Sequence, residues 1–482
     1  MRILLASSEV HPYSKTGGLA DMVGSLAKAL ARSGHEVRIV TPLYHGVRAK
    51  FPAIQPSGLK LDILLASRRV AGEVLEMDQE PRLKIYFIEQ PAFYSRSELY
   101  TGESGDYADN AERFIFFSKA VVQLARGLDW QPEVVHAHDW QSGLVPLLLQ
   151  HEKLVSGWGT APGTCFTIHN LAYQGTFSAA QYPLTNLPWD FFNPNGLEFY
   201  GRMNCMKAGI AYSDVVTTVS PRYAREITTE DYGCGLDGLL RHRQRALTGI
   251  LNGVDYEEWN TTHNRYIKHP YSAENLENKT ANKLDLQAEL GLTVDAAIPL
   301  FGCITRLVEQ KGVDIMLGAL EEMLRADIQF TLLGVGAAVF VQGFQQLQKR
   351  YPGKVCIRIG YDTAYAHQIE AASDFYLMPS RFEPCGLNQM YSLRYGTVPI
   401  VRAVGGLDDT IIDIAADPDR ANGIKFLNYT AGSLAKSIRK ALALFAEPEL
   451  LAYYRRNGME SDFSWEKTAG QYVDVYERAI RG

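Results

Sequence analysis

The chain of 482 residues is long enough for about two or three domains, each with its own core. Hydrophobic residues make up 46% of it and charged residues 21%, which excludes a disordered or collagen-like protein. Because 54 Asp and Glu outweigh 48 Lys and Arg, the net charge is −6, and we expect no nucleic acid among its partners.

The cysteines and apolar runs indicate the compartment. The six cysteines form no C-x-x-C pair and no spacing typical of a zinc site or a disulfide framework. The apolar run from Ile3 to Ala6 is too short for a signal peptide core, and no apolar run is long enough to span a membrane. We therefore expect a cytoplasmic protein with reduced thiols that does not bind membranes.

A βαβ unit opens each half of the chain. Strand-like runs at 2–7 and 36–41 flank a stretch with helical spacing, 19–32. The second half repeats this order of strand, helix and strand at 298–304, 313–325 and 329–333. Further strands are predicted at 133–136, 164–168, 214–219, 356–359, 374–378 and 398–401. This alternation predicts an α/β fold with parallel sheets covered by helices on both faces.

A polar seam divides the chain. A Gly-rich turn at 249–253 leads into a polar stretch that lasts to about residue 296, which places a domain boundary near residue 250. The last segment, 463–482, has the pattern of an amphipathic helix that could dock on either domain.

The loop between the first predicted strand and helix suits a phosphate. Lys15, Gly17 and Gly18 stand just before the helix, and Asp21 follows them. Glycines let a ligand approach the backbone, and a helix N-terminus favours negative charge. The loop matches neither the P-loop nor the dinucleotide-binding motif, so we regard it as a weak signal when taken alone.

The second half repeats this arrangement. Arg306 and Lys311 follow its first strand and precede its first helix. Ligands of open parallel sheets bind beyond the carboxyl ends of the strands. If the two domains face each other, Lys15, Arg306 and Lys311 line one cleft and predict a diphosphate site. The alternative is that these are solvated loop charges.

The segment 380–387 (SRFEPCGL) predicts a shaped loop between a strand and a helix. Glu383 in this loop is a candidate ligand-binding carboxylate, or simply a favourable partner of the helix dipole. The backbone around Cys385 could join the phosphate site. Gly405-Gly406 makes a further tight turn at the same sheet edge, and Tyr361 offers a ring on which a base could stack.

Histidines close two predicted strands of the first half. His136, His138 and Asp139 lie together, and His169 follows the next strand. The spacing of HAHD does not fit an H-x-H-x-D metal site, so we expect internally bonded or substrate-contacting side chains. The D-x-D at 417–419 follows a helical stretch and is predicted to be a turn. Motifs of triad hydrolases and zincins are missing from the sequence.

Taken together, these segments resemble the bacterial glycogen synthase and plant starch synthase family of retaining glycosyltransferases. The resemblance rests on KTGGLAD at 15–21, HAHDW at 136–140, IHNLAYQG at 168–175, LNGVD at 251–255, TRLVEQKG at 305–312 and SRFEPCGLNQ at 380–389. It implies two facing Rossmann-like domains of the GT-B type. These would be an acceptor-side domain at 1–249, a nucleotide-sugar domain at 250–458, and a C-terminal helix at 459–482 that crosses back to the first domain.

The resemblance also implies a reaction. The donor would be ADP-glucose, and glucose would be added to the non-reducing end of an α-1,4-glucan such as glycogen, starch or a maltooligosaccharide. Configuration would be retained, and neither a metal nor another cofactor would be required. The alternatives are a related GT-B glucosyltransferase that uses UDP-glucose or another acceptor, and an inactive glucan-binding scaffold.

The resemblance assigns roles to particular residues. Arg306 and Lys311 would hold the diphosphate, while His169 and Glu383 would hold the donor glucose. The full set of implied catalytic residues is Glu383, His169, Arg306, Lys311, Lys15 and Asp139. The implied substrate-binding residues are Lys15, Gly17, Gly18, Asp21, Asn252, Arg306, Lys311, Tyr361, Cys385, Gly386, Leu387 and Asn388. Asn388 stands where many relatives have Thr.

The count of carboxylates bears on the mechanism. Glu383 is the one strong carboxylate candidate; together with the retention that the resemblance implies, this favours attack on the face from which the diphosphate departs. A double displacement would need a second, placed carboxylate. Asp139 is the one candidate for that role, and we do not expect it to act as a nucleophile.

Overall fold

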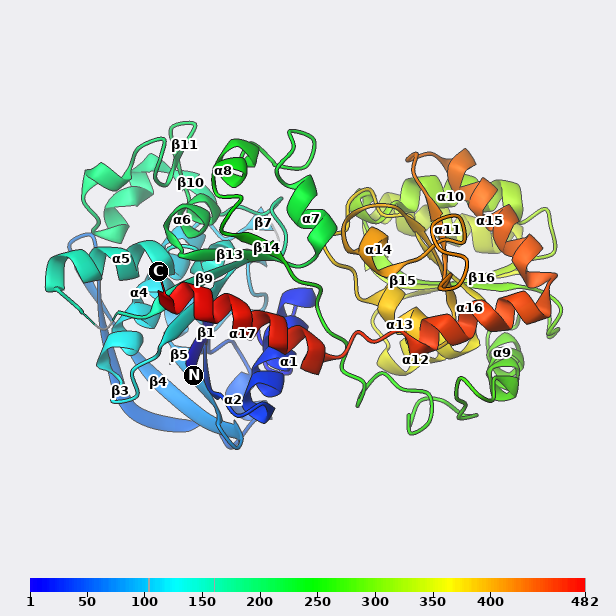
Figure 1. The fold of residues 1–482 in the computed structure, drawn as a ribbon, viewed down its shortest axis with the longest axis horizontal. Coiled ribbons are helices and arrows are strands. Elements are labelled where there is room, and N and C mark those ends of the chain that lie inside the picture. The colour runs from blue at the N-terminus through cyan, green and yellow to red at the C-terminus, as the bar shows by residue number, and fades with distance from the viewer. Residues whose placement is uncertain (103–104, 160, 482) are drawn as a thin grey trace. The chain divides into compact units, whose positions relative to one another are not determined.

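The structure is a computed structural model that describes residues 1–102, 105–159 and 161–481. It divides into two compact units (Figure 1). The first unit contains the chain up to Gly253 and the C-terminal segment from Trp465, and the residues between them form the second. The sequence had placed these boundaries near residue 250 and at residue 459. The segment 459–464, which was expected in the returning helix, thus belongs to the second unit.

The main sheet of the first unit has the strand order β14-β13-β9-β8-β1-β2-β5-β4-β3. Its strands are β1 (Arg2–Ala6), β2 (Glu36–Pro42), β3 (Gln55–Leu65), β4 (Arg68–Glu80), β5 (Leu83–Glu89), β8 (Val134–His138), β9 (Gly163–Ile168), β13 (Val215–Thr218) and β14 (Leu247–Gly249). Neighbours from β14 to β5 are parallel, which confirms the α/β fold. Chain order runs outward from β1 through β2 on one side and through β8 on the other. The reversal between β1 and β8 marks the usual ligand-binding edge of such a sheet.

The strands β3 and β4 depart from the predicted pattern. They pair antiparallel with each other, and β4 pairs antiparallel with β5, so the expectation of purely parallel sheets is wrong here. The two strands are joined by residues 66–67 alone, a connection that can join only antiparallel neighbours. Along β3, buried and exposed residues alternate, as in a sheet with one face toward water.

Helices of the first unit are α1 (Gly18–Arg32), α2 (Val47–Lys50), α3 (Pro91–Tyr94), α4 (Asn110–Gly127), α5 (Val145–Ser156), α6 (Cys205–Tyr212), α7 (Pro221–Glu226), α8 (Asp237–His242) and α17 (Trp465–Arg481). The short strands are β6 (Thr101–Gly102), β7 (Gly105–Asp106), β10 (Thr176–Ser178), β11 (Glu198–Phe199) and β12 (Arg202–Asn204). In neither unit does a helix of the described ranges have the length and apolar character needed to cross a membrane.

The C-terminal helix α17 packs on the first unit, along β9 and α1 (Figure 1). Its buried face includes Trp465, Tyr472 and Tyr476, which the sequence had offered for packing. The Tyr476 hydroxyl lies 2.8 Å from His136 Nδ1 in β8. At Gly163 the helix approaches so closely that a Cβ there would lie 2.4 Å from the Ala479 carbonyl oxygen.

The sheet of the second unit is parallel throughout, with the order β17-β16-β15-β18-β19-β20. Its strands are β15 (Leu300–Leu307), β16 (Gln329–Gly336), β17 (Val355–Ile359), β18 (Phe375–Met378), β19 (Val398–Arg402) and β20 (Ile424–Phe426). This is the strand order of the Rossmann fold. The order reverses between β15 and β18, so the ligand-binding edge is expected where these two strands end.

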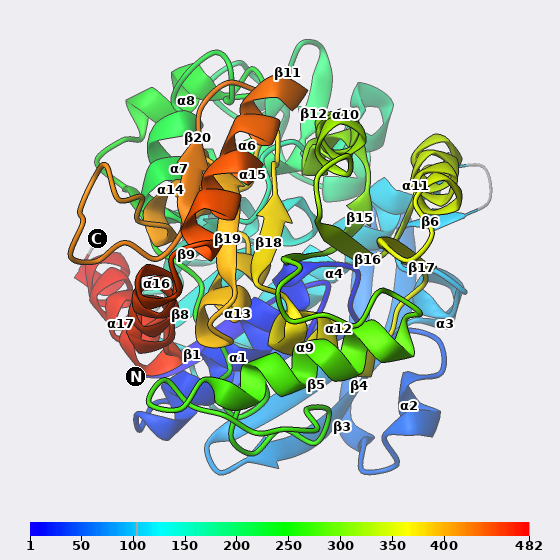
Figure 2. The ribbon, with the colours of Figure 1, turned by 90° about the vertical axis from the view of Figure 1, so that its right-hand side faces the viewer.

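Helices cover both faces of this sheet (Figure 2). They are α9 (Glu277–Glu289), α10 (Val313–Met323), α11 (Ala338–Arg350), α12 (Thr363–Ala372), α13 (Asn388–Arg394), α14 (Gly405–Thr410), α15 (Ala431–Phe445) and α16 (Pro448–Glu460). The largest core cluster joins the sheet to α10, α11 and α15. A separate cluster joins it to α9 and α12, which accounts for the second covered face.

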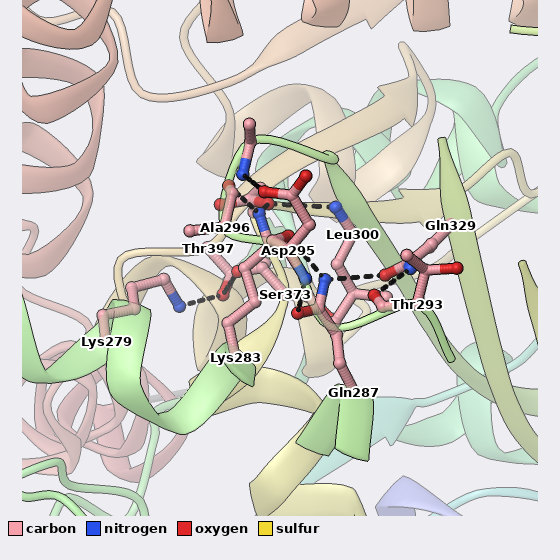
Figure 3. Close-up of polar contacts among 12 residues, drawn as sticks. Lys279, Lys283, Gln287, Thr293, Asp295, Ala296, Leu300, Gln329, Ser373 and Thr397 are labelled. Carbon is pink, nitrogen blue, oxygen red and sulfur yellow. Dashed lines mark hydrogen bonds and ion pairs between the residues drawn. The ribbon is translucent and has the colours of Figure 1, made fainter. Parts of the chain in front are cut away.

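Two buried lysines attach α9 to the amino ends of the strands (Figure 3). Lys279 Nζ donates to Thr397 Oγ1 at 2.7 Å and to two backbone carbonyls. Lys283 Nζ lies 2.7 Å from Asp374 Oδ2. Asp374 also accepts from the Leu300 N–H at 2.9 Å and from Arg455 at 2.6 Å. This network lies at the opposite end of the strands from the expected ligand-binding edge.

The close approach at Gly163 gives the first prediction. We expect Gly163→Ala to lower the stability of the protein by about 1–3 kcal/mol, because the added methyl group would overpack the contact with α17. Gly470→Ala is the control: Gly470 lies in α17 itself, and a Cβ there meets nothing within 4 Å. Thermal unfolding measures both. Equal stability of the Gly163 variant and the wild type would contradict the tight contact.

The buried Glu370 gives a prediction on pH. Its Oε2 accepts from Ser392 Oγ at 2.7 Å, and burial raises its pKa from 4.5 to about 8. A carboxyl whose pKa is raised on folding favours the folded state below its unfolded pKa, and this contribution is lost as the pH rises through the folded pKa. We therefore expect the melting temperature of Glu370→Gln to rise relative to wild type as the pH goes from 4.5, the unfolded pKa, to about 8, the folded pKa. A difference that is constant over this range would contradict the raised pKa.

Candidate active site

The residues singled out in the sequence lie at the carboxyl ends of strands in both units. Lys15, Asp139 and His169 follow β1, β8 and β9 in the first unit. In the second unit, Arg306 is the next-to-last residue of β15, whereas the sequence placed it after the strand, and Glu383 follows β18. Both groups thus lie at the edge where ligands of such sheets bind.

A buried carboxylate holds the loop that contains Lys15. Glu9 accepts from the Thr16 backbone N–H at 2.5 Å, from Thr16 Oγ1 at 2.6 Å and from the Tyr100 hydroxyl at 2.7 Å. Its side chain is almost fully buried. Glu9 was not among the residues predicted for the site; the available signal is a lone acidic residue shortly after an apolar strand, which indicates a structured loop.

The loop itself is open toward solvent. Lys15 Nζ lies 2.8 Å from both carboxylate oxygens of Asp21, so Asp21 positions this cation in the structure. Gly17 and Gly18 are exposed, and a Cβ on Gly17 would meet nothing within 4 Å. The backbone of the loop is therefore accessible to a ligand.

Asp139 and His169 are held together beyond β8 and β9. The Asp139 backbone adopts φ 54°, which is unusual for a residue other than glycine. Its Oδ1 accepts from the His169 backbone N–H at 2.8 Å. Burial raises the pKa of the Asp139 carboxyl to about 7 and lowers the pKa of the His169 imidazole to about 3. His169 is therefore neutral at physiological pH.

Two further histidines, His136 and His138, have different partners. His138 Nδ1 lies 3.1 Å from His169 Nε2, so His138 supports the site. His136 bonds to the Tyr476 hydroxyl and to Thr167 Oγ1, which confirms that it is an internally bonded histidine. Asn252 is 5% exposed, and its Oδ1 has no hydrogen-bond partner among the described residues.

In the second unit, Lys311 and Glu383 form an ion pair. Lys311 Nζ lies 2.6 Å from Glu383 Oε2, which also accepts from Ser380 Oγ at 2.9 Å. Glu383 is thus more than a partner of the helix dipole. Gly312 allows this approach: its φ is 70°, and a Cβ would lie 2.0 Å from the Pro379 carbonyl oxygen.

The loop around Glu383 rests on Gly405 and Gly406. A Cβ on Gly405 would lie 1.9 Å from the Glu383 carbonyl oxygen, and the Gly406 N–H donates to that oxygen at 3.2 Å. Cys385 is buried, so it would reach a ligand through its backbone. The Asn388 side chain bonds inside the protein, to the Ile304 carbonyl and the Tyr376 hydroxyl.

Two predicted ligand-binding side chains are exposed. The Arg306 guanidinium reaches Gln310 Oε1 at 3.5 Å, a weak contact that leaves its charge accessible. Tyr361, which follows β17, is 86% exposed. Both lie at the same sheet edge as the Lys311 and Glu383 pair.

No cluster of three or more His, Cys, Asp or Glu able to hold a metal ion occurs in the part of the chain that the structure describes. The D-x-D at 417–419 lies in a loop with a turn, where the Asp419 N–H donates to Asp417 Oδ1 at 3.1 Å. The prediction of a turn is therefore confirmed.

Comparison with known proteins identifies the family. The starch synthase catalytic domain family matches residues 2–242, and the family of glycosyl transferases group 1 matches residues 294–460. The glycogen synthase of Koribacter versatilis is 44% identical, over 99% of this chain and 98% of that protein. The glycogen synthase of Myxococcus xanthus is 46% identical over the whole of both chains.

Comparison with solved structures supports the same family. The catalytic domain of starch synthase IV from Arabidopsis thaliana, bound to ADP and acarbose, superimposes with a TM-score of 0.91 at 33% identity, over 100% of this chain and 99% of that one. Sucrose-phosphate synthase from Thermosynechococcus elongatus, at 19% identity and a TM-score of 0.64 over 100% of this chain and 99% of that one, shares the fold. The chain therefore belongs to the glycogen and starch synthase family, and it is a glycosyltransferase with the GT-B fold.

Proposed function

We propose that this protein transfers glucose from ADP-glucose to the non-reducing end of an α-1,4-glucan, with retention of configuration and without a metal ion. As a member of its family it is a glycogen or starch synthase. We propose in addition the donor, the acceptor, the stereochemistry and the role of each site residue. The observation that carries it is the Lys311 and Glu383 pair at the reversal point of the second sheet.

Cations at this edge suit a departing diphosphate. In glycosyl transfer the barrier lies in separating a positive sugar from a negative leaving group, and preorganised positive charge at the leaving group lowers it. Arg306 has an accessible guanidinium, and Lys311 is already held in place by Glu383. These two side chains would supply the charge that a metal ion supplies in other transferases. The accessible ring of Tyr361 would contact the adenine.

Glu383 would bind hydroxyls of the donor glucose. Lys311 and Ser380 both donate to its Oε2, and among the described residues none donates to its Oε1. A carboxylate oxygen accepts sugar hydroxyls well, because a hydrogen bond to a charged acceptor is stronger than one to a neutral acceptor. The backbone from Cys385 to Asn388 would contact the phosphates.

For the first unit we propose sugar and phosphate contacts. His169, Asp139 and Asn252 would hold the glucose, with the His169 carbonyl near the developing positive charge. Lys15, with Gly17, Gly18 and Asp21, would contribute to phosphate binding. The openness of the loop above Gly17 and the unused Oδ1 of Asn252 support these roles.

The carboxylates argue against a double displacement as the route to the proposed retention. Asp139 is a poor nucleophile, because its Oδ1 is bonded to a backbone N–H and its pKa is about 7. We therefore propose attack by the acceptor O4 on the face from which the diphosphate leaves. The bond from the anomeric carbon to the diphosphate oxygen breaks as the bond to O4 forms. The O4 proton passes to the departing diphosphate.

The first test is a transfer assay with ADP-glucose and UDP-glucose side by side, with EDTA present. We expect release of ADP with incorporation of α-linked glucose into glycogen, and a rate unchanged by the chelator, because Arg306 and Lys311 replace the metal. Proton NMR of the product reports the linkage. Preference for UDP-glucose or loss of activity in EDTA would contradict the proposal, and glucan binding without turnover would indicate a scaffold.

The second test removes the ion pair. We expect Lys311→Ala and Glu383→Ala to lower kcat by about 100-fold or more, since each removes charge placed at the reacting groups. Lys354→Ala is the matched control, because Lys354 pairs with Asp327 near the amino end of β17, away from the site. Full activity in either site variant would overturn the assignment of these residues.

A further inference from the structure

The strands β15 and β18 separate where the proposed donor site begins. Their shared register comprises Phe301 opposite Phe375 and Gly302 opposite Tyr376. On its other side, β15 stays paired with β16 over its whole length, to Leu307. Beyond Gly302, β15 therefore leads to Arg306 and β18 leads to the Glu383 loop without a ladder between them.

The hydroxyl of Tyr376 fills this opening. It accepts from the Ile304 N–H at 2.8 Å and donates to the Ile304 carbonyl at 2.8 Å. The backbone groups of Ile304 thus bond to a side chain of the neighbouring strand. Tyr376 is 1% exposed, so these bonds are shielded from water.

Asn388, the first residue of α13, completes the arrangement. Its Nδ2 donates to the Ile304 carbonyl and to the Tyr376 hydroxyl, both at 2.7 Å. A tyrosine hydroxyl has one proton and two lone pairs, and an amide nitrogen has two protons. The hydroxyl proton, both hydroxyl lone pairs and both amide protons each take part in a hydrogen bond. The resulting network joins β15, β18 and α13.

We propose that Tyr376 and Asn388 are positioning residues for glucosyl transfer: together they fix the spacing between the segment at the end of β15 that contains Arg306 and Lys311 and the loop with Glu383. This inference rests on the proposed function. Neither residue needs to touch the donor through its side chain, because both act through the backbone of Ile304 and the start of α13. Asn388 would therefore influence donor binding indirectly through its amide.

The Asn388 amide has the two protons needed to donate to the Ile304 carbonyl and to the Tyr376 hydroxyl at the same time. A threonine hydroxyl at this position would carry a single proton on a shorter side chain. It cannot donate to the Ile304 carbonyl and to the Tyr376 hydroxyl together. Threonine at position 388 should therefore perform worse than asparagine in this chain.

The test is steady-state kinetics of Tyr376→Phe, Asn388→Thr and the double variant, with melting temperatures for each. We expect KM for ADP-glucose to rise and kcat/KM to fall about tenfold in each single variant, because buried polar groups lose their partners. KM for glycogen should stay within about twofold of wild type. The double variant should lose little more than either single one, since residues of one network are not additive.

Tyr271→Phe is the matched control. The Tyr271 hydroxyl is also buried and donates to a backbone carbonyl, that of Tyr395, at the opposite end of α13. We expect it to affect the melting temperature as much as Tyr376→Phe does, while KM for ADP-glucose stays unchanged. A merely structural role would make the two variants alike.

Direct binding of ADP, measured by calorimetry, separates this inference from the proposed function. ADP should bind several-fold more weakly to Tyr376→Phe and Asn388→Thr than to wild type, whether or not transfer is observed. A wild type that binds ADP but does not transfer glucose would contradict the proposed function alone. Unchanged KM and unchanged ADP affinity in both single variants, or additive losses in the double variant, would overturn the positioning role.

Discussion

The ion pair between Lys311 and Glu383 is the interaction on which the candidate site of the second unit depends. It joins the segments that leave β15 and β18, with 2.6 Å between Nζ and Oε2. Losing one partner of a buried pair costs ~3–5 kcal/mol, so each loop holds the other in place. If a diphosphate leaves at Lys311, as proposed, it would meet a cation whose position is already fixed, which is the condition for strong electrostatic stabilisation of a leaving group.

In both units, polar groups of the loops need hydrogen-bond partners at the point where the strand order reverses. Where parallel strands separate, the loops lose the ladder that would satisfy their polar groups, and buried side chains replace it. In the first unit Glu9 accepts from the backbone and side chain of Thr16. In the second unit, the Tyr376 hydroxyl accepts from the Ile304 N–H and donates to the Ile304 carbonyl. The edges that bind ligands in such sheets are thus held by buried polar groups beneath them.

Local patterns predicted much of this fold. The strand at 2–7 and the helix at 19–32 lie within one residue of β1 and α1 at each end, because apolar periodicity reports burial directly. The antiparallel hairpin of β3 and β4 was missed, since strand direction depends on the neighbour and not on the strand itself. Glu9 and Tyr376 were missed because single residues have no periodic signal, and because Glu9 bonds to Tyr100 and Tyr376 bonds to Ile304, both of which lie far along the chain.

The sequence by itself determined the α/β class, the division near residue 250, the loops with glycine and lysine, and the family. These features depend on the local spacing of residues and on the order of motifs along the chain. The tertiary structure alone decided which side chains meet. Lys311 lies 72 residues from Glu383, and His136 lies 340 residues from Tyr476. Such contacts depend on the order of strands across a sheet, which is set by the packing of the whole unit, and local sequence does not encode it.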